Sequence, residues 1–411
     1  MDGDVLGQAL AGARWPALAA AYRITGDLQF AEDAVQEAMT AALRQWPGGL
    51  PERPGAWLAA TARHKALDQV RREALRPVKE LAAAVQLTQD SPSPEAGGSE
   101  QDPTEQLTLL FLCCHPAFDP VSRAALTLRA VCGLGTREIA AVLLLSESAV
   151  AKRLVRARRK IRDSGLRFAV PDPAELAARV DDVLAVLALL YTEGHRASTG
   201  PDLLRPELCA RAVAVARALA RLLPDPEVLG LLALLLLTEA RTAARTDPDG
   251  NIVLLAEQDR SRYDPVATAE GEELLERALR LGRPGRWQLQ AAIAACHTTA
   301  PTAKDTDWRE VAALYGELLR YDPNIVHEAN RAVAVAMAEG PAAGLAILDA
   351  VAHHPQLARW PTLHVARADL LRRLGRHDDA RAAYTHALTL KPGAAEQSFI
   401  HRQLTTTPAD T

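Results

Sequence analysis

The stretch from Thr136 to Arg162 combines helix-capping hydroxyls, a regular apolar spacing and a dense run of cations. Thr136 is predicted to cap a first short helix and Ser146 a second one, because a hydroxyl before a helix accepts a hydrogen bond from a free backbone N–H. The apolar face of the first helix is predicted from Ile139, Ala140 and Leu143. The inner face of the second is predicted from four residues at helical spacing: Val150, Leu154, Ala157 and Ile161.

The opposite arc of the second helix is predicted to face solvent with five cations: Lys152, Arg153, Arg156, Arg159 and Lys160. Between residues 136 and 167, nine Lys and Arg stand against three Asp and Glu. A helix–turn–helix lays one helix in the DNA major groove, with cations near phosphates and short polar side chains near base edges. The pattern therefore predicts DNA binding through this helix pair.

A second group of residues with chemical potential is acidic and lies on a predicted helix over residues 28–45, capped by Asp27. Its members sit at i, i+1, i+4 and i+5 and form one patch: Glu32, Asp33, Gln36 and Glu37. Such a patch suits a basic helix on a partner protein. A solvated helix face is the alternative.

The sequence gives little support for a metal site or a catalytic site. Cys113, Cys114 and His115 are adjacent, so on a helix they diverge by about 100° and cannot converge on one zinc ion, and a buried structural role is favoured. There is no nucleophile elbow, phosphate-binding loop or metal-ligand spacing. We therefore predict no catalytic residues, no metal and no cofactor.

An enzyme remains one alternative reading. His195, Glu193 or the Asp247/Asp249 pair would then supply the acid–base groups, and turnover lost in His195→Ala would support it. The segment Glu239–Arg262 gathers charged residues around an Asp249-Gly250 turn. It is either a ligand or partner site or, as we favour, an ion-pair network that braces two helices.

Composition favours helices throughout. The chain has 411 residues, of which 48% are hydrophobic and only 4% aromatic, and Ala, Leu and Arg dominate. We expect an all-α protein of two or three domains. The formal charge of −4 conceals a basic N-terminal part and an acidic C-terminal part, so nucleic-acid contact is expected only in the former.

Targeting signals are absent from the sequence. The N-terminus is acidic and lacks a basic n-region, and the apolar run Val228–Leu237 is too short for a membrane span. Five cysteines, an odd number, fit a reducing compartment. We expect a cytoplasmic protein with no membrane contact.

Four parts are expected along the chain. Residues 1–75 read as a helical unit with helices over 4–24, 28–45 and 56–73. Residues 76–103 read as a flexible linker, rich in Ser, Pro, Gly and acid from 88 onward. Residues 104–170 form a second helical unit that contains the helix pair, and residues 171–411 follow after Pro171-Asp172-Pro173.

The last part ends in a repeat signature. Gly375, Ala380, Tyr384, Ala387 and Pro392 have the spacing of a tetratricopeptide unit. The small residues let paired helices approach, the tyrosine fills the space between them, and the proline ends the second helix. Two blurred copies upstream, over 330–355 and 308–323, indicate a helical solenoid.

In four stretches the chain resembles bacterial sigma factors of the extracytoplasmic-function (ECF) group, in the subgroup with a C-terminal tetratricopeptide-like extension. GDLQFAEDAVQEAMTAALRQW (26–46) is similar to the helix that grips the polymerase clamp, and RPGAWLAATARHKALDQVRRE (53–73) to the promoter −10 reader. Residues 111–161 resemble the −35 reader, and residues 234–264 a segment of the extension.

The resemblance implies an all-α protein without a catalytic centre. It would bind core RNA polymerase at the clamp of the largest subunit and at the flap, recruit it to promoter DNA and help to open the duplex. Sigma region 2 would occupy residues 1–75 and region 4 residues 104–170. The extension, 171–411, is expected to control activity, with an unidentified regulatory protein or ligand as its partner.

Site residues follow from the same resemblance. The polymerase clamp would bind Glu32, Asp33, Gln36 and Glu37. The −10 element would contact Arg63, His64, Lys65, Arg71 and Arg72. Base contacts at −35 would fall to Ser146, Glu147, Ser148, Ala149, Lys152 and Arg153, and phosphate contacts to Arg156, Arg158 and Arg159.

The sequence departs from the family pattern at three positions. His64 stands where Asn is common, Leu144 replaces the usual glycine of the turn, and Ala151 occupies a usual lysine position, so no −35 sequence is predicted. Asp68 is expected to hold Arg71 or Arg72 in place rather than to contact a base.

Two further readings stay open. Strand opening needs a pocket for an unstacked base, which we place in the loop Pro47–Pro54 between Trp46 and Trp57, although these two rings are more readily core anchors.

A helix–turn–helix regulator with a tetratricopeptide sensor domain is the alternative to a sigma factor, but it leaves residues 26–73 without a role.

Overall fold

A computed structural model of the chain describes residues 3–79, 103–131, 133–143, 145–164, 173–197 and 203–407. Within these ranges the regular elements are helices, apart from an isolated bridge between Thr246 and Ile252, which confirms the all-α prediction. The chain divides into two compact units, Met1–Leu190 and Tyr191–Thr411, and the division falls inside one helix, α8 (Pro173–His195).

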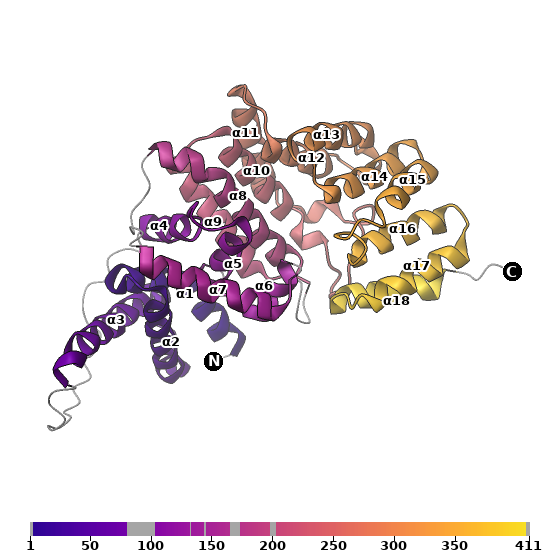
Figure 1. Cartoon of the computed structure of the whole chain (residues 1–411). Coiled ribbons are helices and arrows are strands. Elements are labelled where there is room, and N and C mark those ends of the chain that lie inside the picture. Colours follow the sequence, from indigo (N-terminus) through magenta and orange to yellow (C-terminus); the bar gives the residue numbers. More distant parts are fainter. Residues whose placement is uncertain are drawn as a thin grey trace. The chain divides into compact units, whose positions relative to one another are not determined.

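The first unit begins with three helices, α1 (Gly3–Thr25), α2 (Leu28–Gln45) and α3 (Pro54–Lys79). α1 packs against both of the others, and Figure 1 shows α3 continuing beyond them. Asp27 caps α2 as predicted, since its Oδ1 accepts the N–H groups of Gln29 at 2.7 Å and Phe30 at 3.4 Å. The linker predicted over 76–103 overlaps with α3, which runs to Lys79, and residues 80–102 lie outside the described residues.

The same unit continues with four helices after that gap, α4 (Pro103–Cys113), α5 (Pro120–Ala130), α6 (Thr136–Val142) and α7 (Glu147–Ser164). Cys113 and Cys114 are fully buried at the end of α4, as expected of residues with a structural role. The Cys114 thiol lies 3.6 Å from the Thr127 hydroxyl, and burial raises its pKa to about 12. Arg123 of α5 forms an ion pair with Asp182 of α8.

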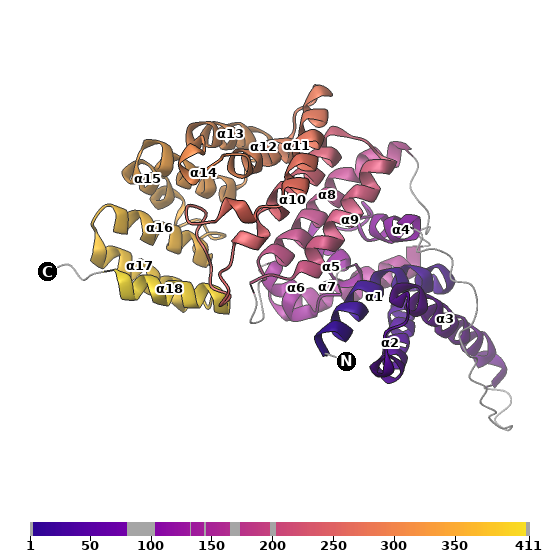
Figure 2. The same ribbon diagram turned by 180° about the vertical axis from the view of Figure 1, so that it is seen from behind.

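The second unit is a succession of ten helices after α8, visible from behind in Figure 2. They are α9 (Pro206–Leu222), α10 (Pro226–Glu239), α11 (Pro265–Arg280), α12 (Arg286–Thr298), α13 (Trp308–Tyr321), α14 (Ile325–Glu339), α15 (Pro341–Val351), α16 (Pro361–Arg373), α17 (His377–Thr389) and α18 (Ala394–Thr406). Most of them pack against their neighbours in sequence, as in a solenoid.

α10 contains the apolar run Val228–Leu237, and nearly every residue of it is buried against α9, α11 and α12. A helix that is apolar on all sides is stable only when it is covered all round. The run is therefore the buried centre around which α9, α11 and α12 pack, and α14 to α18 form a separate apolar cluster. None of the helices in the described ranges has both the length and the apolar character of a membrane span.

The predicted repeat signature lies in the helix pair α16–α17. Ala380, Tyr384 and Ala387 are buried, Gly375 adopts a φ of +75° in the turn between the helices, and Pro392 follows the end of α17. These placements confirm the packing that the spacing predicted. α14 and α15 approach as closely, since a Cβ added to Gly344 would lie 2.4 Å from the Ala332 carbonyl oxygen.

Candidate functional site

The inner face of α7 matches the prediction. Val150, Leu154, Ala157 and Ile161 are each at most 4% exposed. Ser146 caps the helix, because its Oγ accepts the Ala149 N–H at 3.3 Å. The cap predicted for α6 is wrong, since Thr136 is already the first helical residue and the Glu138 carboxylate accepts the Gly135 N–H at 2.6 Å instead. Leu144, the predicted turn residue, lies outside the described residues.

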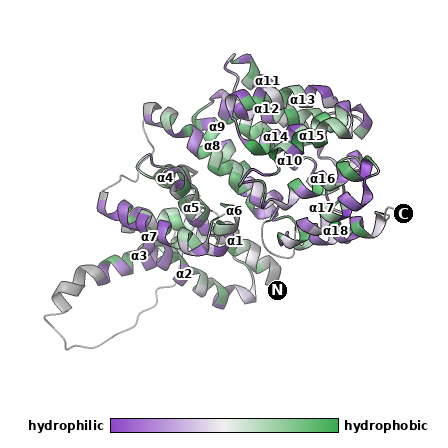
Figure 3. Cartoon of the chain, turned by 45° about the vertical axis from the view of Figure 1, so that its right-hand side comes forward, coloured by the Kyte–Doolittle hydropathy of each residue, from purple (hydrophilic) through white to green (hydrophobic). Residues whose placement is uncertain are grey.

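The cations of α7 divide into two sets. Lys152, Arg156, Arg159 and Lys160 are exposed, and Figure 3 shows the hydrophilic outer side of the helix. Arg159 pairs with Asp163 at 3.4 Å, a weak exposed contact one turn away. Lys160 donates to the Ala117 carbonyl oxygen at 2.6 Å and lies over the Phe118 ring. The exposed set therefore offers several cations on one side of a helix, which is the form of a phosphate-binding surface.

Arg153 is less available than predicted. It is half-buried, and its Nη1 lies 3.1 Å from Oδ1 of Asp119. The pKa of Asp119 is lowered, mainly by the hydrogen bond from the Ser122 hydroxyl and further by the Ser122 N–H and Arg153. Asp119 thus fixes the start of α5 and one cation of α7 together. The first-turn residues Ser146, Glu147 and Ser148 are exposed, and Ala149 is half-buried.

Arg158 faces another way, toward α2. Its Nη2 lies 2.6 Å from Oε2 of Glu32, and the Nε of Arg129 in α5 lies 3.8 Å from the other oxygen of the same carboxylate. One turn later, Arg162 lies 2.6 Å from Oδ2 of Asp27, whose Oδ1 caps α2. One side of α7 is therefore bound to the acidic side of α2.

The predicted acidic patch is divided by this contact. Glu32 is 9% exposed, whereas Asp33, Gln36 and Glu37 remain open to solvent. Glu37 is 3.7 Å from Lys65 of α3, an exposed pair. The structure thus brings three of the four predicted residues to the surface and places the fourth against α7.

The predicted −10 residues follow α3. His64, Arg71 and Arg72 are exposed, while Arg63 and Lys65 are half-buried. Asp68 lies 4.0 Å from Arg71, and Arg72 donates to the Asp68 carbonyl oxygen at 3.3 Å, which agrees with the positioning role expected for Asp68. Leu67 and Val70, two apolar residues of the same helix, are each 40% exposed, and the far part of α3 extends past α1 and α2.

The two tryptophans beside the loop Pro47–Pro54 lie together. Trp46 is 2% exposed and stacks edge-on with Trp57, with ring centroids 5.4 Å apart. Trp46 is therefore a core anchor, as the sequence favoured.

Sequence reasoning missed the contacts between the two helical parts of the first unit. Besides the pairs of Glu32 and Asp27, Arg14 of α1 donates to the carbonyl oxygens of Arg129 and Ala130 at 3.2 and 3.1 Å. The spacing of Arg158 and Arg162, one turn apart, matches two carboxylates at the start of α2. Nothing in a single sequence says that these two segments meet.

In the second unit, the ion-pair network favoured for the segment Glu239–Arg262 is wrong, since none of its charged side chains pairs with an opposite charge among the described residues, and hydrogen bonds shape the segment instead. Asp247 accepts hydrogen bonds from the Asn251 N–H at 2.8 Å and the Asn251 side chain at 3.0 Å, and Gly250 turns with a φ of +79°. These bonds hold the loop in shape. The side chain of Arg402 in α18 reaches the same loop at Asn251.

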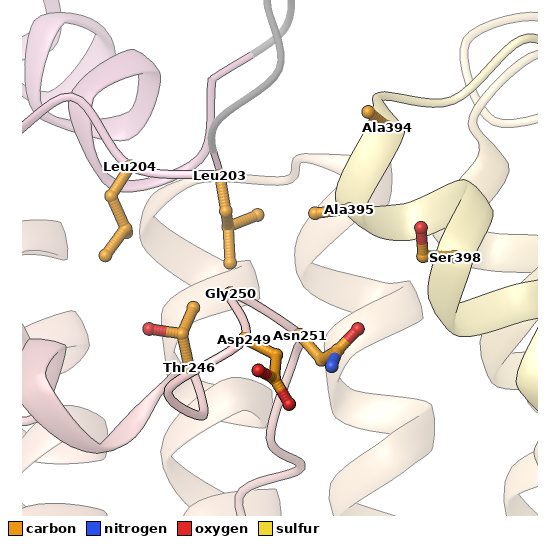
Figure 4. A pocket seen from close by; sticks show the side chains of 9 residues that line it. All are labelled: Leu203, Leu204, Thr246, Asp249, Gly250, Asn251, Ala394, Ala395 and Ser398. Atoms are coloured by element: carbon orange, nitrogen blue, oxygen red, sulfur yellow. The ribbon is translucent and has the colours of Figure 1, made fainter.

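A cavity of about 370 Å³ opens beside this loop (Figure 4). Its lining comes from the loop, from the start of α18 and from the two leucines before α9, and consists of Leu203, Leu204, Thr246, Asp249, Gly250, Asn251, Ala394, Ala395 and Ser398. It presents a single ionisable side chain, Asp249, and no second group to work with it. No three His, Cys, Asp or Glu side chains gather as a metal site anywhere in the described residues.

His195, the catalytic candidate of the enzyme reading, is surrounded by protein. Its ring stacks on Tyr191 with centroids 5.5 Å apart, and burial together with Arg245 and Arg241 lowers its pKa to about 2. It is therefore uncharged at neutral pH. A base with this pKa is too weak to serve as an efficient proton acceptor near pH 7.

Comparison with protein families places three matches along the chain. Residues 16–76 match Sigma-70 region 2, and residues 109–161 match Sigma-70 region 4. Residues 179–279 match a family of unknown function, DUF6596. The first two matches contain α2, α3, α6 and most of α7, and the third contains α9, α10 and the segment that follows them.

Two relatives extend this picture. "Uncharacterized protein R00370" of Rhizobium meliloti (strain 1021) is 38% identical over 401 residues, which cover 96% of this chain and 94% of the relative. "Probable ECF RNA polymerase sigma factor SigI" of Mycobacterium tuberculosis is 29% identical over 161 residues, or 38% of this chain and 53% of that protein. No solved structure matches the chain.

Proposed function

The chain belongs to the ECF RNA polymerase sigma factors and carries a C-terminal extension, and from this premise we propose that its first unit uses three separate surfaces in transcription initiation. Family membership implies core RNA polymerase and promoter DNA as partners. In the proposal, the polymerase clamp binds Asp33, Gln36 and Glu37 on α2, the −10 element binds the cations of α3, and the −35 element binds α7. The flap of the polymerase meets region 4, and the protein acts in the cytoplasm with the polymerase.

The observation that carries the proposal is the exposure of Lys152, Arg156 and Arg159 on α7 within a region 4 match that follows a region 2 match. The first turn of the helix, with Ser146 and Ser148, is open for base contact, and the later cations are open for phosphate contact. A helix–turn–helix regulator would also explain α7, but it would have no use for region 2.

The pairing of α2 with α7 adds a step to this function. Elements centred at −10 and −35 are about 25 base pairs apart, or about 85 Å along B-DNA. A unit held together by the Arg158–Glu32 and Arg162–Asp27 pairs is much shorter than that, since about 190 residues pack into a body with a radius of gyration of about 16 Å. We therefore propose that these pairs separate when the protein engages both elements.

The chain between the two regions is long enough for this separation. Twenty-three residues lie between Lys79 and Pro103, and a chain of that length spans up to about 80 Å. Together with the lengths of the helices themselves, this reach covers the distance between the two elements. We call the arrangement held by the Arg158–Glu32 and Arg162–Asp27 pairs the closed form, and the arrangement without them the open form. The closed form also covers Glu32, so this carboxylate reaches the clamp only after α7 has moved away.

We further propose that the extension, from α8 onward, controls the activity of the first unit. The test is run-off transcription with purified core polymerase on genomic fragments, comparing the full chain with a version that ends after Leu190. A cut at this point keeps Asp182 and its ion pair with Arg123, which a cut near residue 170 would remove. Circular dichroism confirms that the shortened protein is helical.

The full chain is expected to yield promoter-specific transcripts with core polymerase and none without it. Control by the extension predicts that the shortened protein differs from it in rate by at least about fivefold, which corresponds to about 1 kcal/mol. Equal rates would remove the control function but leave the sigma function standing. No transcripts from either form on any fragment would overturn both.

A further inference from the structure

Three arginines lie together in the second unit without a carboxylate to neutralise them. Arg241 follows α10, Arg245 ends the short helix after it (Thr242–Ala244), and Arg260 starts another short helix (Arg260–Arg262). Across the described part of the chain, none of the three forms an ion pair. Other arginines of the same unit do, as Arg217 does with Glu270 and Arg331 with Glu328.

Neutral oxygens hold two of these guanidinium groups in place. Arg245 donates to the His195 carbonyl oxygen at 2.5 Å. Arg260 donates to the carbonyl oxygens of His297 and Ala300 at 2.5 and 2.9 Å. The two groups are thereby oriented while their charges stay uncompensated.

Arg241 lies between them. The charges of Arg241 and Arg245 both lower the pKa of His195, and the charges of Arg241 and Arg260 both lower the pKa of His297. Burial is the main cause of the lowered pKa in both histidines. It also lowers the pKa of Arg241, and it lowers the pKa of Arg245 to about 10. The three arginines thus concentrate positive charge among the helices of the second unit.

Several nitrogen atoms of this cluster are buried and have no hydrogen-bond partner among the described residues. They are Nε of Arg241, Nε of Arg260, Nδ1 of His195 and Nδ1 of His297. Buried polar atoms in folded proteins are nearly always paired. Here two of the three unneutralised arginines and both neighbouring histidines each have an unpaired nitrogen, although the side chains keep part of their surface accessible.

We propose that this cluster, the arginine site, binds the phosphate or carboxylate group of a small soluble molecule. Guanidinium groups present paired N–H donors that match the oxygens of both groups, and burial strengthens such bonds. The neutral imidazoles of His195 and His297 donate or accept beside them according to tautomer. Glu239, at the end of α10, forms no ion pair with these arginines in the described part of the chain, and its carboxylate accepts the hydroxyl of Tyr191 at 2.8 Å.

The bracing role that the sequence favoured for this segment explains only part of the cluster. It accounts for the carbonyl contacts of Arg245 and Arg260. It does not account for Arg241, which no carboxylate or carbonyl oxygen of the described residues holds. The arginine site goes beyond the proposed sigma function and does not depend on it.

Arg241→Gln in the full chain separates the two roles without any ligand. If Arg241 binds an anion, removal of one unneutralised charge leaves the Tm unchanged or raises it, since repulsion within the cluster falls. If Arg241 is a brace, the Tm falls. The matched control is Arg277→Gln, an exposed arginine on α11.

Binding is tested with inorganic phosphate and with succinate, each at constant ionic strength, by thermal unfolding and titration calorimetry. A saturable rise in the Tm of about 3 °C or more is expected with one of them, lost in Arg241→Gln and kept in Arg277→Gln. A response to phosphate alone identifies a phosphate-bearing ligand, and a response to succinate alone a carboxylate-bearing one. No saturable response to either, or an equal response in Arg241→Gln, overturns the proposal.

Discussion

The Nη2 atom of Arg158 lies 2.6 Å from Oε2 of Glu32, although 126 residues separate them in the sequence. The contact joins α7 of region 4, for which we propose DNA binding, to α2 of region 2, which was expected to hold the polymerase. Each residue was assigned to a different macromolecule on sequence grounds, and in the free protein they satisfy one another. The charges proposed to recognise partners thus also hold α7 against α2.

The strength of this pair is open to direct measurement. Both side chains are largely buried, so a double-mutant cycle with Glu32→Gln and Arg158→Gln is expected to give a coupling energy of about 1–3 kcal/mol in urea unfolding. The control cycle uses Arg159 and Asp163, an exposed pair on the same helix, for which about 0.3–0.5 kcal/mol is expected. Equal coupling in the two cycles would contradict the role given to Glu32.

Glu32→Gln alone is expected to favour the open form and so to strengthen binding of the free protein to a promoter duplex by roughly fivefold or more. The physical reason is that weakening the closed state by about 1 kcal/mol raises the population of the binding-competent state in proportion. Fluorescence anisotropy with a labelled duplex measures the change. Glu272→Gln on α11 is the control, and weaker binding in Glu32→Gln would rule out a closed resting state.

The open part of the acidic patch is expected to carry polymerase binding. Reversal of Asp33 and Glu37 to Lys should abolish co-elution with core polymerase while the helical circular dichroism signal stays the same, because both side chains are exposed. Glu272→Lys with Glu276→Lys has the same spacing on α11 and should bind normally. Retained binding by the α2 variant would remove this patch from the interface.

The outer cations of α7 are expected to contact phosphates. Arg156→Ala with Arg159→Ala should lower promoter affinity and reduce the slope of log affinity against log salt by about one to two. Arg277→Ala with Arg280→Ala repeats the spacing on α11 as the control. A slope equal to that of the unmodified protein would show that these two side chains do not touch the DNA backbone.

His297 gives the second unit a pH dependence. Burial, with help from Arg241 and Arg260, holds its pKa at about 4, below the ordinary 6.5, so below about pH 6.5 the unfolded chain binds a proton that the folded chain does not. Its contribution to stability is complete above that pH and is lost as the pH falls toward 4. At pH 5 the loss is about 2 kcal/mol.

The variant His297→Gln should therefore unfold with a smaller change in stability between pH 7 and pH 5 than the unmodified chain. Urea unfolding at several pH values measures the difference. His401→Gln, at an exposed position of α18, is the control and should keep the original slope. A slope unchanged by His297→Gln would mean that this ring is not held neutral by its surroundings.

Local features of the fold were predictable because short-range chemistry decides them. The Asp27 cap, the inner face of α7 and the buried positions of α17 each depend on residues within a few turns of one helix. Thr136 is not the cap because α6 already begins at this residue, and it is the Glu138 carboxylate that bonds to the backbone before the helix, at the Gly135 N–H. Competition of this kind between neighbouring side chains is not visible in spacing alone.

Tertiary partners were not predictable. Periodicity placed Glu32 on the same side of α2 as Asp33 and Glu37 but could not say that α7 packs there. The family resemblance grouped Arg158 with Arg156 and Arg159, although its position on α7 directs it toward Glu32 of α2. Leu67 and Val70 are apolar yet 40% exposed, which follows from the length of α3 beyond its supporting helices and not from their residue type.

The all-round burial of α10 has a consequence for biosynthesis. When α10 has just emerged from the ribosome, its apolar surface stays exposed until α11 and α12, some forty to sixty residues later, emerge and cover it. The first unit is by then entirely outside the exit tunnel, so the two halves mature at different moments. Premature stop codons between these helices should yield polypeptides that aggregate or are degraded by quality-control proteases.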